Sequence, residues 1–180
     1  VSGPEVVTPK LDEESFFVSD GTRLPLSRWV PVTPPRAVVV AVQGYTDYRN
    51  AFALPAPFLA ASGIAVYAYD QRGFGAASQR GLWPGRDLMV RDLTELIRYL
   101  RRIWVDVPLF VLGDSMGAAV AITTLSDPTT ANEVQGLILN APAVWGAETF
   151  NPFYRAGLWL LAHTIPWYET SGKGIKRTIS

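Results

Sequence analysis

The amino-acid sequence predicts an α/β domain in which a mostly parallel sheet is flanked by helices. Four continuous apolar runs are typical of strands buried on both faces of a parallel sheet, namely residues 37–42, 64–69, 109–112 and 137–139. Helical patterns separate the later runs: residues 93–104 carry apolar side chains at helical spacing, and residues 116–125 are short and rich in alanine. This alternation of strands and helices is typical of an α/β fold with right-handed crossovers.

The segment before the first buried run predicts an antiparallel hairpin. Phe16, Phe17 and Val18 precede a turn at Asp20-Gly21, and residues 24–29 alternate on the return. We therefore expect the parallel sheet to be extended by an N-terminal antiparallel hairpin.

The pattern changes again after Pro142. The last part of the chain is rich in aromatic side chains, including Trp145, Phe150, Phe153, Tyr154, Trp159, Trp167 and Tyr168. Residues 158–162 suggest a short amphipathic helix in place of another strand. We expect residues 1–143 to form the N-terminal part of the core and residues 144–180 to form an apolar cap or lid.

Composition excludes several classes of function. The 180 residues hold 16 Lys and Arg against 16 Asp and Glu, and this lack of net charge argues against nucleic acid or an anionic membrane surface as a partner. With no cysteine and one histidine, thiol nucleophiles and His-rich metal sites are excluded. No apolar run reaches the ~18–20 residues of a membrane span. We expect a soluble protein, cytoplasmic or exported with its signal already removed, and the sequence does not decide between the two.

The residues from Gly113 to Gly117 form a G-x-S-x-G motif with Ser115 at its centre. The motif directly follows a predicted strand and opens a predicted helix, the context in which such a serine is a nucleophile on a strained turn. The two glycines are expected because the turn leaves almost no room for side chains. A chance match is the alternative, since the pattern is common, but the strand and helix around it favour the nucleophile.

A nucleophilic serine in acyl transfer needs N–H donors for the oxyanion that develops on the substrate. The backbone amide of Met116, directly after the serine, is one candidate. The second is the amide of Tyr45 in the loop after residues 37–42, where Gly44 permits close approach of the backbone. The alternative for Gly44 is an ordinary glycine turn at a strand end.

The loop from Asp70 to Gly75 follows the next predicted strand. It does not fit a dinucleotide-binding fingerprint, because the third glycine position is Ser78 and no helix opens there. We expect Asp70 and Arg72 to hold this loop beside the mouth of the site and to take no part in catalysis.

These motifs, Gln43-Gly44-Tyr45, Asp70-x-Arg72-Gly73-x-Gly75 and Gly113-x-Ser115-x-Gly117, occur in an order that resembles the α/β-hydrolase superfamily. The similarity runs from the hairpin into the cap, and it looks most like the lysophospholipase and monoacylglycerol lipase branch, which is also grouped with serine aminopeptidases. Two positions depart from the usual pattern: Gln43 replaces a histidine, and Asp114 replaces a glutamate.

The resemblance implies an α/β-hydrolase fold with a mostly parallel sheet, the N-terminal hairpin, flanking helices and the start of a helical cap. It implies an acyl-enzyme on Ser115, no metal or other cofactor, and a small-molecule ester or lipid-like substrate such as a monoacylglycerol or lysophospholipid. In this superfamily the serine is followed by an acid and then by a histidine.

His163 is the one histidine of the sequence, so a triad made within this chain must use it. Asp127 and Glu148 lie between Ser115 and His163, but Asp127 is expected about 18 Å from the serine, at the far end of the helix that the serine opens. We expect instead that the acid, the histidine and the C-terminal strands are absent, and that this chain is the N-terminal portion of a hydrolase whose C-terminal half is missing. Alone, it should turn over esters poorly or not at all.

Two other interpretations remain open. A non-catalytic binder of apolar ligands could keep the pocket and cap of a hydrolase without its triad. A separate chain could also complete the site, since absent strands would leave an open sheet edge.

Overall fold

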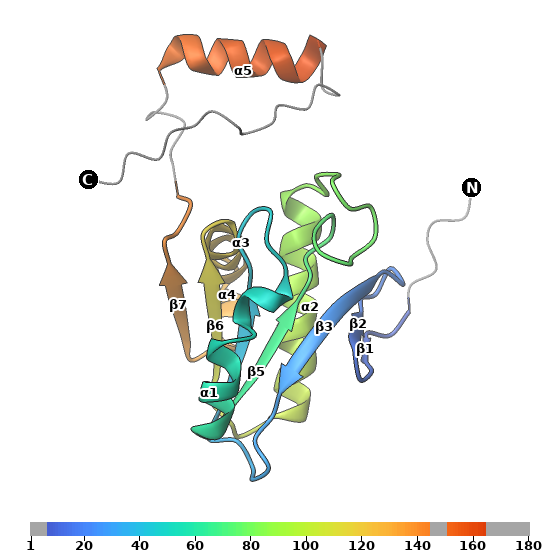
Figure 1. Cartoon of the computed structure of the whole chain (residues 1–180), viewed down its shortest axis with the longest axis vertical. Coiled ribbons are helices and arrows are strands. Elements are labelled where there is room, and N and C mark those ends of the chain that lie inside the picture. Colours follow the sequence, from blue (N-terminus) through green and yellow to red (C-terminus); the bar gives the residue numbers. More distant parts are fainter. Residues whose placement is uncertain (1–6, 145–150, 165–180) are drawn as a thin grey trace. The chain divides into compact units, whose positions relative to one another are not determined.

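A computed structural model of the chain describes residues 7–144 and 151–164 (Figure 1). The chain divides into two compact units, Val1–Ala143 and Val144–Ser180, and each is described by itself. The elements of the first unit are β1 (Lys10–Leu11), β2 (Ser15–Phe17), β3 (Arg23–Trp29), β4 (Ala37–Val42), a 3-10 helix η1 (Arg49–Phe52), α1 (Pro55–Ala61), β5 (Ile64–Tyr69), α2 (Arg86–Ile103), β6 (Leu109–Asp114), α3 (Met116–Leu125), α4 (Pro128–Ala131) and β7 (Gly136–Asn140).

Seven strands form one mixed sheet in the order β1-β2-β3-β5-β4-β6-β7. The strands β4, β5, β6 and β7 pair in parallel, whereas β3 pairs antiparallel with β5 and carries the hairpin partner β2 on its other side. The predicted fold class, a mostly parallel sheet with an N-terminal antiparallel hairpin, is confirmed.

The strand order places a topological switch point at β4. After β4 the chain crosses to β5 on one side, while β6 pairs with β4 on the other side, with Val42 opposite Gly113. The loops that leave the carboxyl ends of β4 and β6 therefore diverge, which is where open α/β sheets bind their ligands. Gly44 and Ser115 lie in these two loops.

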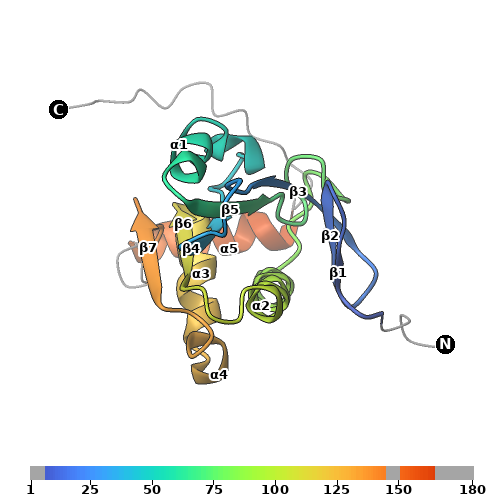
Figure 2. The ribbon, with the colours of Figure 1, turned by 90° about the horizontal axis from the view of Figure 1, so that it is seen from below.

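Helices cover both faces of the sheet: α1 lies on one side, and α2 and α3 lie on the other (Figure 2). Alternate residues of β4 separate into the two cores accordingly. Val38, Val40 and Val42 are buried with the apolar face of α2, while Val39 and Ala41 are buried with Phe52 and Ala56 of η1 and α1. Burial on both faces explains why these strands are continuous apolar runs in the sequence.

The prediction for residues 137–139 is correct in part. β7 forms there, but the prediction that it is buried on both faces is wrong. Ile138 and Leu139 are 47% and 42% exposed, because β7 pairs with β6 alone among the described residues and so lies at the sheet edge. The apolar side chains of a strand show how much surface it can bury, but how much is actually buried depends on the elements that pack against it.

The second unit contains α5 (Pro152–Thr164), which includes residues 158–162, where the sequence suggests a short amphipathic helix, and extends beyond them on both sides. Its described apolar side chains are exposed, including Phe153, Trp159, Leu160 and Leu161. Four aromatic residues of the predicted cap lie outside the described residues: Trp145, Phe150, Trp167 and Tyr168. The cap or lid role of this unit stays a prediction.

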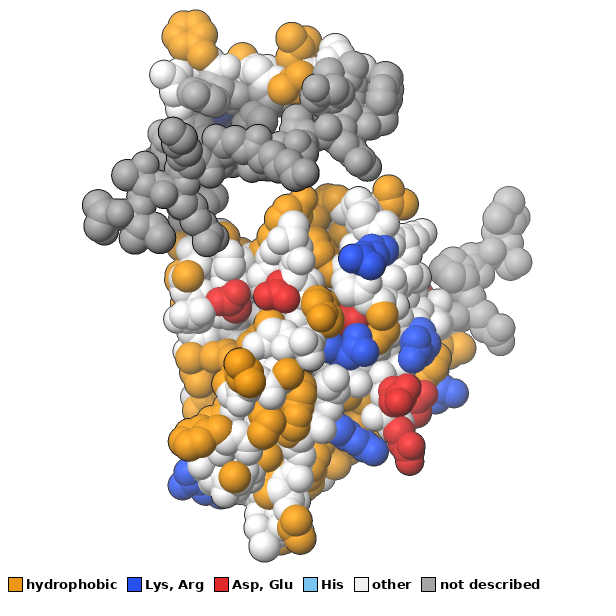
Figure 3. Space-filling model, in the orientation of Figure 1, with side chains coloured by type: hydrophobic (Ala, Val, Ile, Leu, Met, Phe, Trp, Pro, Cys, Tyr) orange, Lys and Arg blue, Asp and Glu red, His pale blue; other side chains and the backbone are white. Residues whose placement is uncertain are grey.

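The surface of the first unit carries charges of both signs. Lys and Arg side chains lie among Asp and Glu side chains on the face shown in Figure 3, and apolar side chains lie between them. Within the described ranges, no helix combines the length and the apolar character that crossing a bilayer would require.

Candidate active site

Ser115 occupies a sharp turn between β6 and α3. Its backbone angles, φ 50° and ψ −110°, place a residue with a side chain in a region that glycine favours. The turn is held from β7 and the segment after it: the Ser115 N–H donates to the Asn140 carbonyl (2.9 Å), and the Ser115 carbonyl accepts from Ala143 N–H (3.1 Å). Such strain persists only where neighbouring bonds fix the backbone, and it is concentrated at functional sites.

The two glycines of the motif are required by close backbone packing. A Cβ at Gly113 would lie 2.4 Å from the Cα of Ala118, and one at Gly117 would lie 2.1 Å from the carbonyl oxygen of Val42. Both distances are far inside van der Waals contact. The first turn of α3 is therefore pressed against the ends of β4 and β6, and this contact fixes the height of Ser115 above the sheet.

Gly117→Ala is expected to destabilise the protein although it adds a good helix former. The alanine gains about 1 kcal/mol in helix propensity, but its methyl group meets a backbone carbonyl that no side-chain rotation can move. Overpacking of this kind costs about 1–3 kcal/mol and occasionally more, so we expect a net loss. Urea unfolding measures it, with Gly157→Ala in α5 as control, where an added Cβ meets nothing within 4 Å. Equal midpoints for Gly117→Ala and the unmodified protein would contradict the packing argument.

The loop after β4 passes directly beside the serine. A Cβ at Gly44 would lie 3.3 Å from the Cβ of Ser115 and 3.0 Å from Oδ2 of Asp114. Among the described residues, the N–H groups of Tyr45 and Met116 have no hydrogen-bond acceptor. The side chains differ, since that of Met116 is buried and that of Tyr45 is 65% exposed with its ring against Phe74. Two backbone donors without partners thus flank Ser115, in the two loops where the sequence predicts them.

A buried pair of glutamines anchors the loop that carries Gly44. With its side-chain nitrogen toward Tyr69, Gln43 donates to the Tyr69 carbonyl (2.8 Å) and accepts from the Gln71 N–H (3.1 Å). The Gln71 side chain donates back to the Gln43 carbonyl (2.9 Å). Sequence reasoning noted Gln43 only as a departure from a family pattern and missed Gln71. Gln43 directly follows β4 and Gln71 lies two residues after the end of β5, and glutamine in such a loop has no distinctive pattern that would mark the pairing in the sequence.

Asp70 holds two loops together at the end of β5. Its fully buried carboxylate accepts from the N–H groups of Arg49 (2.8 Å) and Ala76 (2.7 Å), and it pairs with the Arg49 guanidinium. A Cβ at Gly75 would lie 2.3 Å from this carboxylate, so that position has no room for a side chain. Asp70 therefore fixes the position of the loop after β4 relative to the loop after β5.

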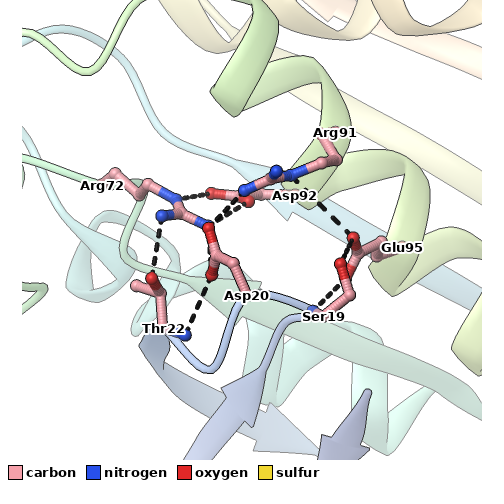
Figure 4. A network of polar contacts seen from close by, with 7 residues as sticks. All are labelled: Ser19, Asp20, Thr22, Arg72, Arg91, Asp92 and Glu95. Atoms are coloured by element: carbon pink, nitrogen blue, oxygen red, sulfur yellow. Dashed lines mark hydrogen bonds and ion pairs between the residues drawn. The ribbon is translucent and has the colours of Figure 1, made fainter. Parts of the chain in front are cut away.

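Arg72 belongs to a separate polar network (Figure 4). Its guanidinium donates to both carboxylate oxygens of Asp92 on α2 (2.6 and 2.9 Å), to Asp20 (3.0 Å) and to the Thr22 hydroxyl (2.8 Å). Burial raises the pKa of Asp92 to about 6 against the opposing effect of Arg72. Burial acts in the same direction on Asp20, but there the hydrogen bonds from Thr22 and the charge of Arg72 outweigh it and lower the pKa to about 2. The network joins the loop after β5 to α2 and to the β2–β3 turn.

The candidate acids and base fall in three different settings. Asp127 caps α4, accepting from the N–H of Thr129 (3.1 Å), and the side-chain hydrogen bond from Thr129 lowers its pKa. Glu148 lies outside the described residues. His163 lies on α5 in the second unit, with Nδ1 2.7 Å from the Trp159 carbonyl and its ring stacked on that of Trp159. The contacts of Asp127 are those of a structural residue, and His163 as the base stays a prediction.

The described residues contain no group of three or more His, Cys, Asp or Glu side chains arranged to hold a metal ion. The functional groups gathered around Ser115 are backbone N–H donors and side chains that fix the loops. The chemistry that such an arrangement supports is attack by a hydroxyl on a carbonyl carbon, with the resulting oxyanion bound by N–H groups.

Comparison with known proteins shows the family of the chain. The family described as "Serine aminopeptidase, S33" matches residues 33–180. The chain is similar to a monoacylglycerol lipase of Mycolicibacterium smegmatis, with 29% identity over 89% of this chain and 57% of that protein. It is also similar to the monoglyceride lipase of Rattus norvegicus, with 28% identity over 76% of this chain and 45% of that protein. The chain thus spans about half the length of the relatives it matches.

Solved structures give the same fold. A soluble variant of the monoglyceride lipase from Saccharomyces cerevisiae, in complex with a substrate analog, superposes with a TM-score of 0.66 at 24% identity, over 92% of this chain and 55% of that one. A structure described as "Lipase (Open form)" gives a TM-score of 0.75 at 22% identity, over 94% and 58% of the two chains. The chain belongs to the serine aminopeptidase S33 family of the α/β-hydrolase superfamily.

Proposed function

We propose that the protein containing this chain is a lipase- or esterase-type hydrolase that cleaves carboxylic esters through an acyl-enzyme on Ser115. The observation that supports this most directly is Ser115 in a strained turn, with Gly44 packed beside it and the N–H groups of Tyr45 and Met116 without an acceptor among the described residues. Strain and free donors both cost stability, and a role in catalysis accounts for both.

The proposed reaction has two steps. The Ser115 oxygen attacks the ester carbonyl carbon while a base takes its proton, and the N–H groups of Tyr45 and Met116 bind the oxyanion. The bond to the alcohol breaks and the alcohol leaves with that proton, so that the acyl group remains on Ser115. Water then attacks the acyl-enzyme and releases the carboxylic acid.

Two groups could serve as the base that takes the proton of Ser115. One form of the proposal uses His163, the single histidine of the sequence, and the other uses an acid and a histidine that these 180 residues do not contain. The second form agrees with relatives about twice as long as the matched segment. It also implies that the isolated chain hydrolyses esters poorly, because a serine without a base is a weak nucleophile.

The proposed substrate has an apolar acyl group, as in monoacylglycerols or lysophospholipids. Two observations support this proposal. The relatives are monoacylglycerol lipases, and the apolar side chains of α5, among them Phe153 and Trp159, are exposed in the unit that we propose as a cap, residues 144–180. Exposed aromatic side chains of this kind commonly contact apolar ligands.

A substrate panel tests this proposal on the full product of the gene that encodes the chain. We expect kcat/KM for p-nitrophenyl esters and monoacylglycerols to rise with acyl length, since each buried methylene contributes about 0.8 kcal/mol. Aminoacyl p-nitroanilides serve as the peptidase comparison and should be turned over far more slowly. Faster cleavage of the anilides would show a peptidase, and no cleavage of any ester by the folded protein would favour a non-catalytic binder.

A further inference from the structure

A pocket of about 350 Å³ lies between the loop after β4 and the loop after β5, lined by residues 45–48, 73–75 and 80–83. It begins at Tyr45, the residue next to Gly44, so one end of the pocket adjoins the serine turn. Ser115 itself does not line it. The pocket therefore adjoins the serine turn without including it, a position suited to a part of the substrate that does not react.

The two walls of this pocket are held by defined contacts. Buried Asp70 binds the N–H groups of Arg49 and Ala76, which adjoin the two walls. Within the second wall, Gly73 accepts from Gly81 N–H (2.8 Å) and donates to the Ser78 carbonyl (3.2 Å). Its backbone is also packed so closely that a Cβ at Gly73 would lie 2.1 Å from the Leu82 carbonyl oxygen. The shape of the pocket is thus specified by hydrogen bonds and close packing.

Four aromatic rings line the pocket, those of Tyr45, Tyr48, Phe74 and Trp83. Three of these side chains are exposed, at 65% for Tyr45, 45% for Tyr48 and 59% for Trp83. Burial in a core does not explain large rings that stay exposed around a concave site. Contact with a ligand does, and aromatic rings placed together in this way bind organic cations, above all quaternary ammonium groups.

The same pocket holds two opposite charges that do not neutralise each other. Asp47 and Arg80 both line it, yet no ion pair joins them, and neither pairs with another described residue. The Asp47 carboxylate accepts from the N–H of Tyr48 (2.8 Å), which leaves acceptor capacity for a cation. A free guanidinium is the group that proteins use most readily for phosphate.

We infer that this pocket binds a phosphocholine head group, with the trimethylammonium group against the aromatic rings and Asp47 and the phosphate on Arg80. A neutral glycerol group would use neither charge. A simple anion would leave the carboxylate and rings without a role, and a simple cation would leave the guanidinium unused. For turnover this inference rests on the proposed function, and it selects choline lysophospholipids among the proposed substrates, with the alcohol side of the ester in the pocket.

Binding can be tested without turnover, so failure of the two proposals is distinguishable. Isothermal titration calorimetry with glycerophosphocholine, phosphocholine, phosphoethanolamine, choline and glycerol would use both this chain and the full gene product, each also as Ser115→Ala. We expect glycerophosphocholine and phosphocholine to bind and glycerol not to bind. Phosphoethanolamine should bind about threefold to tenfold more weakly than phosphocholine, because its ammonium group is a poorer partner for the rings. Ser115→Ala should leave every affinity unchanged.

Two variants separate the two halves of the pocket. Arg80→Gln should weaken phosphocholine binding about tenfold or more and leave choline binding unchanged. Trp83→Leu should weaken both ligands about threefold to tenfold. Arg23→Gln, an exposed arginine on β3 outside the pocket, is the matched control and should change neither. Circular dichroism checks that each variant is folded.

Several results would overturn the inference. These are no binding of phosphocholine to folded protein, equal binding of phosphoethanolamine, or an unchanged affinity in Arg80→Gln. If glycerophosphocholine binds but phosphocholine does not, the pocket recognises the glycerol and not the head group, and the assignment also fails. Faster turnover of a lysophosphatidylcholine than of the matching monoacylglycerol would extend the result to the substrate.

Discussion

Ser115→Ala is expected to lower ester hydrolysis by the full gene product by at least about 10⁴-fold, because removal of the proposed nucleophile leaves only binding and oxyanion stabilisation. The fold should persist, since alanine meets the same backbone strain as serine at φ 50°. The initial rate of p-nitrophenyl ester hydrolysis measures the effect. Ser126→Ala, at the other end of α3, is the control and should keep full activity.

A second substitution separates strain from chemistry at the same position. Ser115→Gly should be as inactive as Ser115→Ala, yet it should unfold at higher urea concentration, because glycine relieves strain on the order of 1–3 kcal/mol. The loss of chain entropy offsets part of this gain. If the glycine variant is less stable than the alanine variant, Ser115 does not hold the strain that the backbone angles indicate.

Arg72→Met is expected to cause the largest loss of stability, about 3–5 kcal/mol, because it leaves the buried Asp92 carboxylate without its cation. A loss of that size is a large share of the stability of an ordinary domain. Arg72→Met combined with Asp92→Leu should recover much of it, since no unpaired charge then remains buried. Arg86→Met is the control, because its ion pair with Asp87 is exposed and should contribute little. Urea unfolding at neutral pH compares the four proteins, and equal losses for Arg72→Met and Arg86→Met would contradict the role of the network.

The same network predicts how stability changes with pH. The pKa of Asp92 is about 6 in the folded protein, whereas the ordinary pKa of an aspartate, which applies to the unfolded chain, is 3.8. Between these two pH values the folded state holds a proton that the unfolded state has lost. The contribution of Asp92 to the free energy of unfolding is therefore at its most favourable below pH 3.8, and it declines as the pH rises through 6. The decline amounts to about 1 kcal/mol between pH 5 and pH 7. Asp92→Asn should remove this part of the slope, and an unchanged slope in that variant would show that Asp92 titrates normally.

Much of the fold follows from local pattern. The runs of β4 and β5 are visible in the sequence because both faces of these strands are buried, and the helical spacing within α2 is visible because one face of that helix is buried. Short elements were harder to predict. β1 has two residues, and α1 begins with two prolines in its first three positions, so neither offers a periodic pattern. β7 could be predicted as a strand, but its exposure depends on neighbours that its own residues do not specify.

The candidate site divides in the same way. Ser115 could be located because a tight turn between a strand and a helix constrains the residues next to it, and Gly44 because a glycine in the loop after a buried strand permits close approach of the backbone. Gln71 and Asp47 could not, because their roles depend on distant partners in the fold. Gln71 reaches the carbonyl of Gln43 across two adjacent strand ends, and Asp47 shares a pocket with residues from another loop. Glutamine and aspartate are common in loops, so neither residue has a distinctive sequence signal.

Covalent labelling of the full gene product by a fluorophosphonate probe tests the central claim most directly. The probe reacts only with a serine that is activated as a nucleophile, and peptide mass spectrometry identifies the residue modified. The account predicts a single adduct on the peptide that contains Ser115, absent in Ser115→Ala and present in Ser126→Ala. Folded protein that forms no adduct, or an adduct that persists in Ser115→Ala, would contradict it.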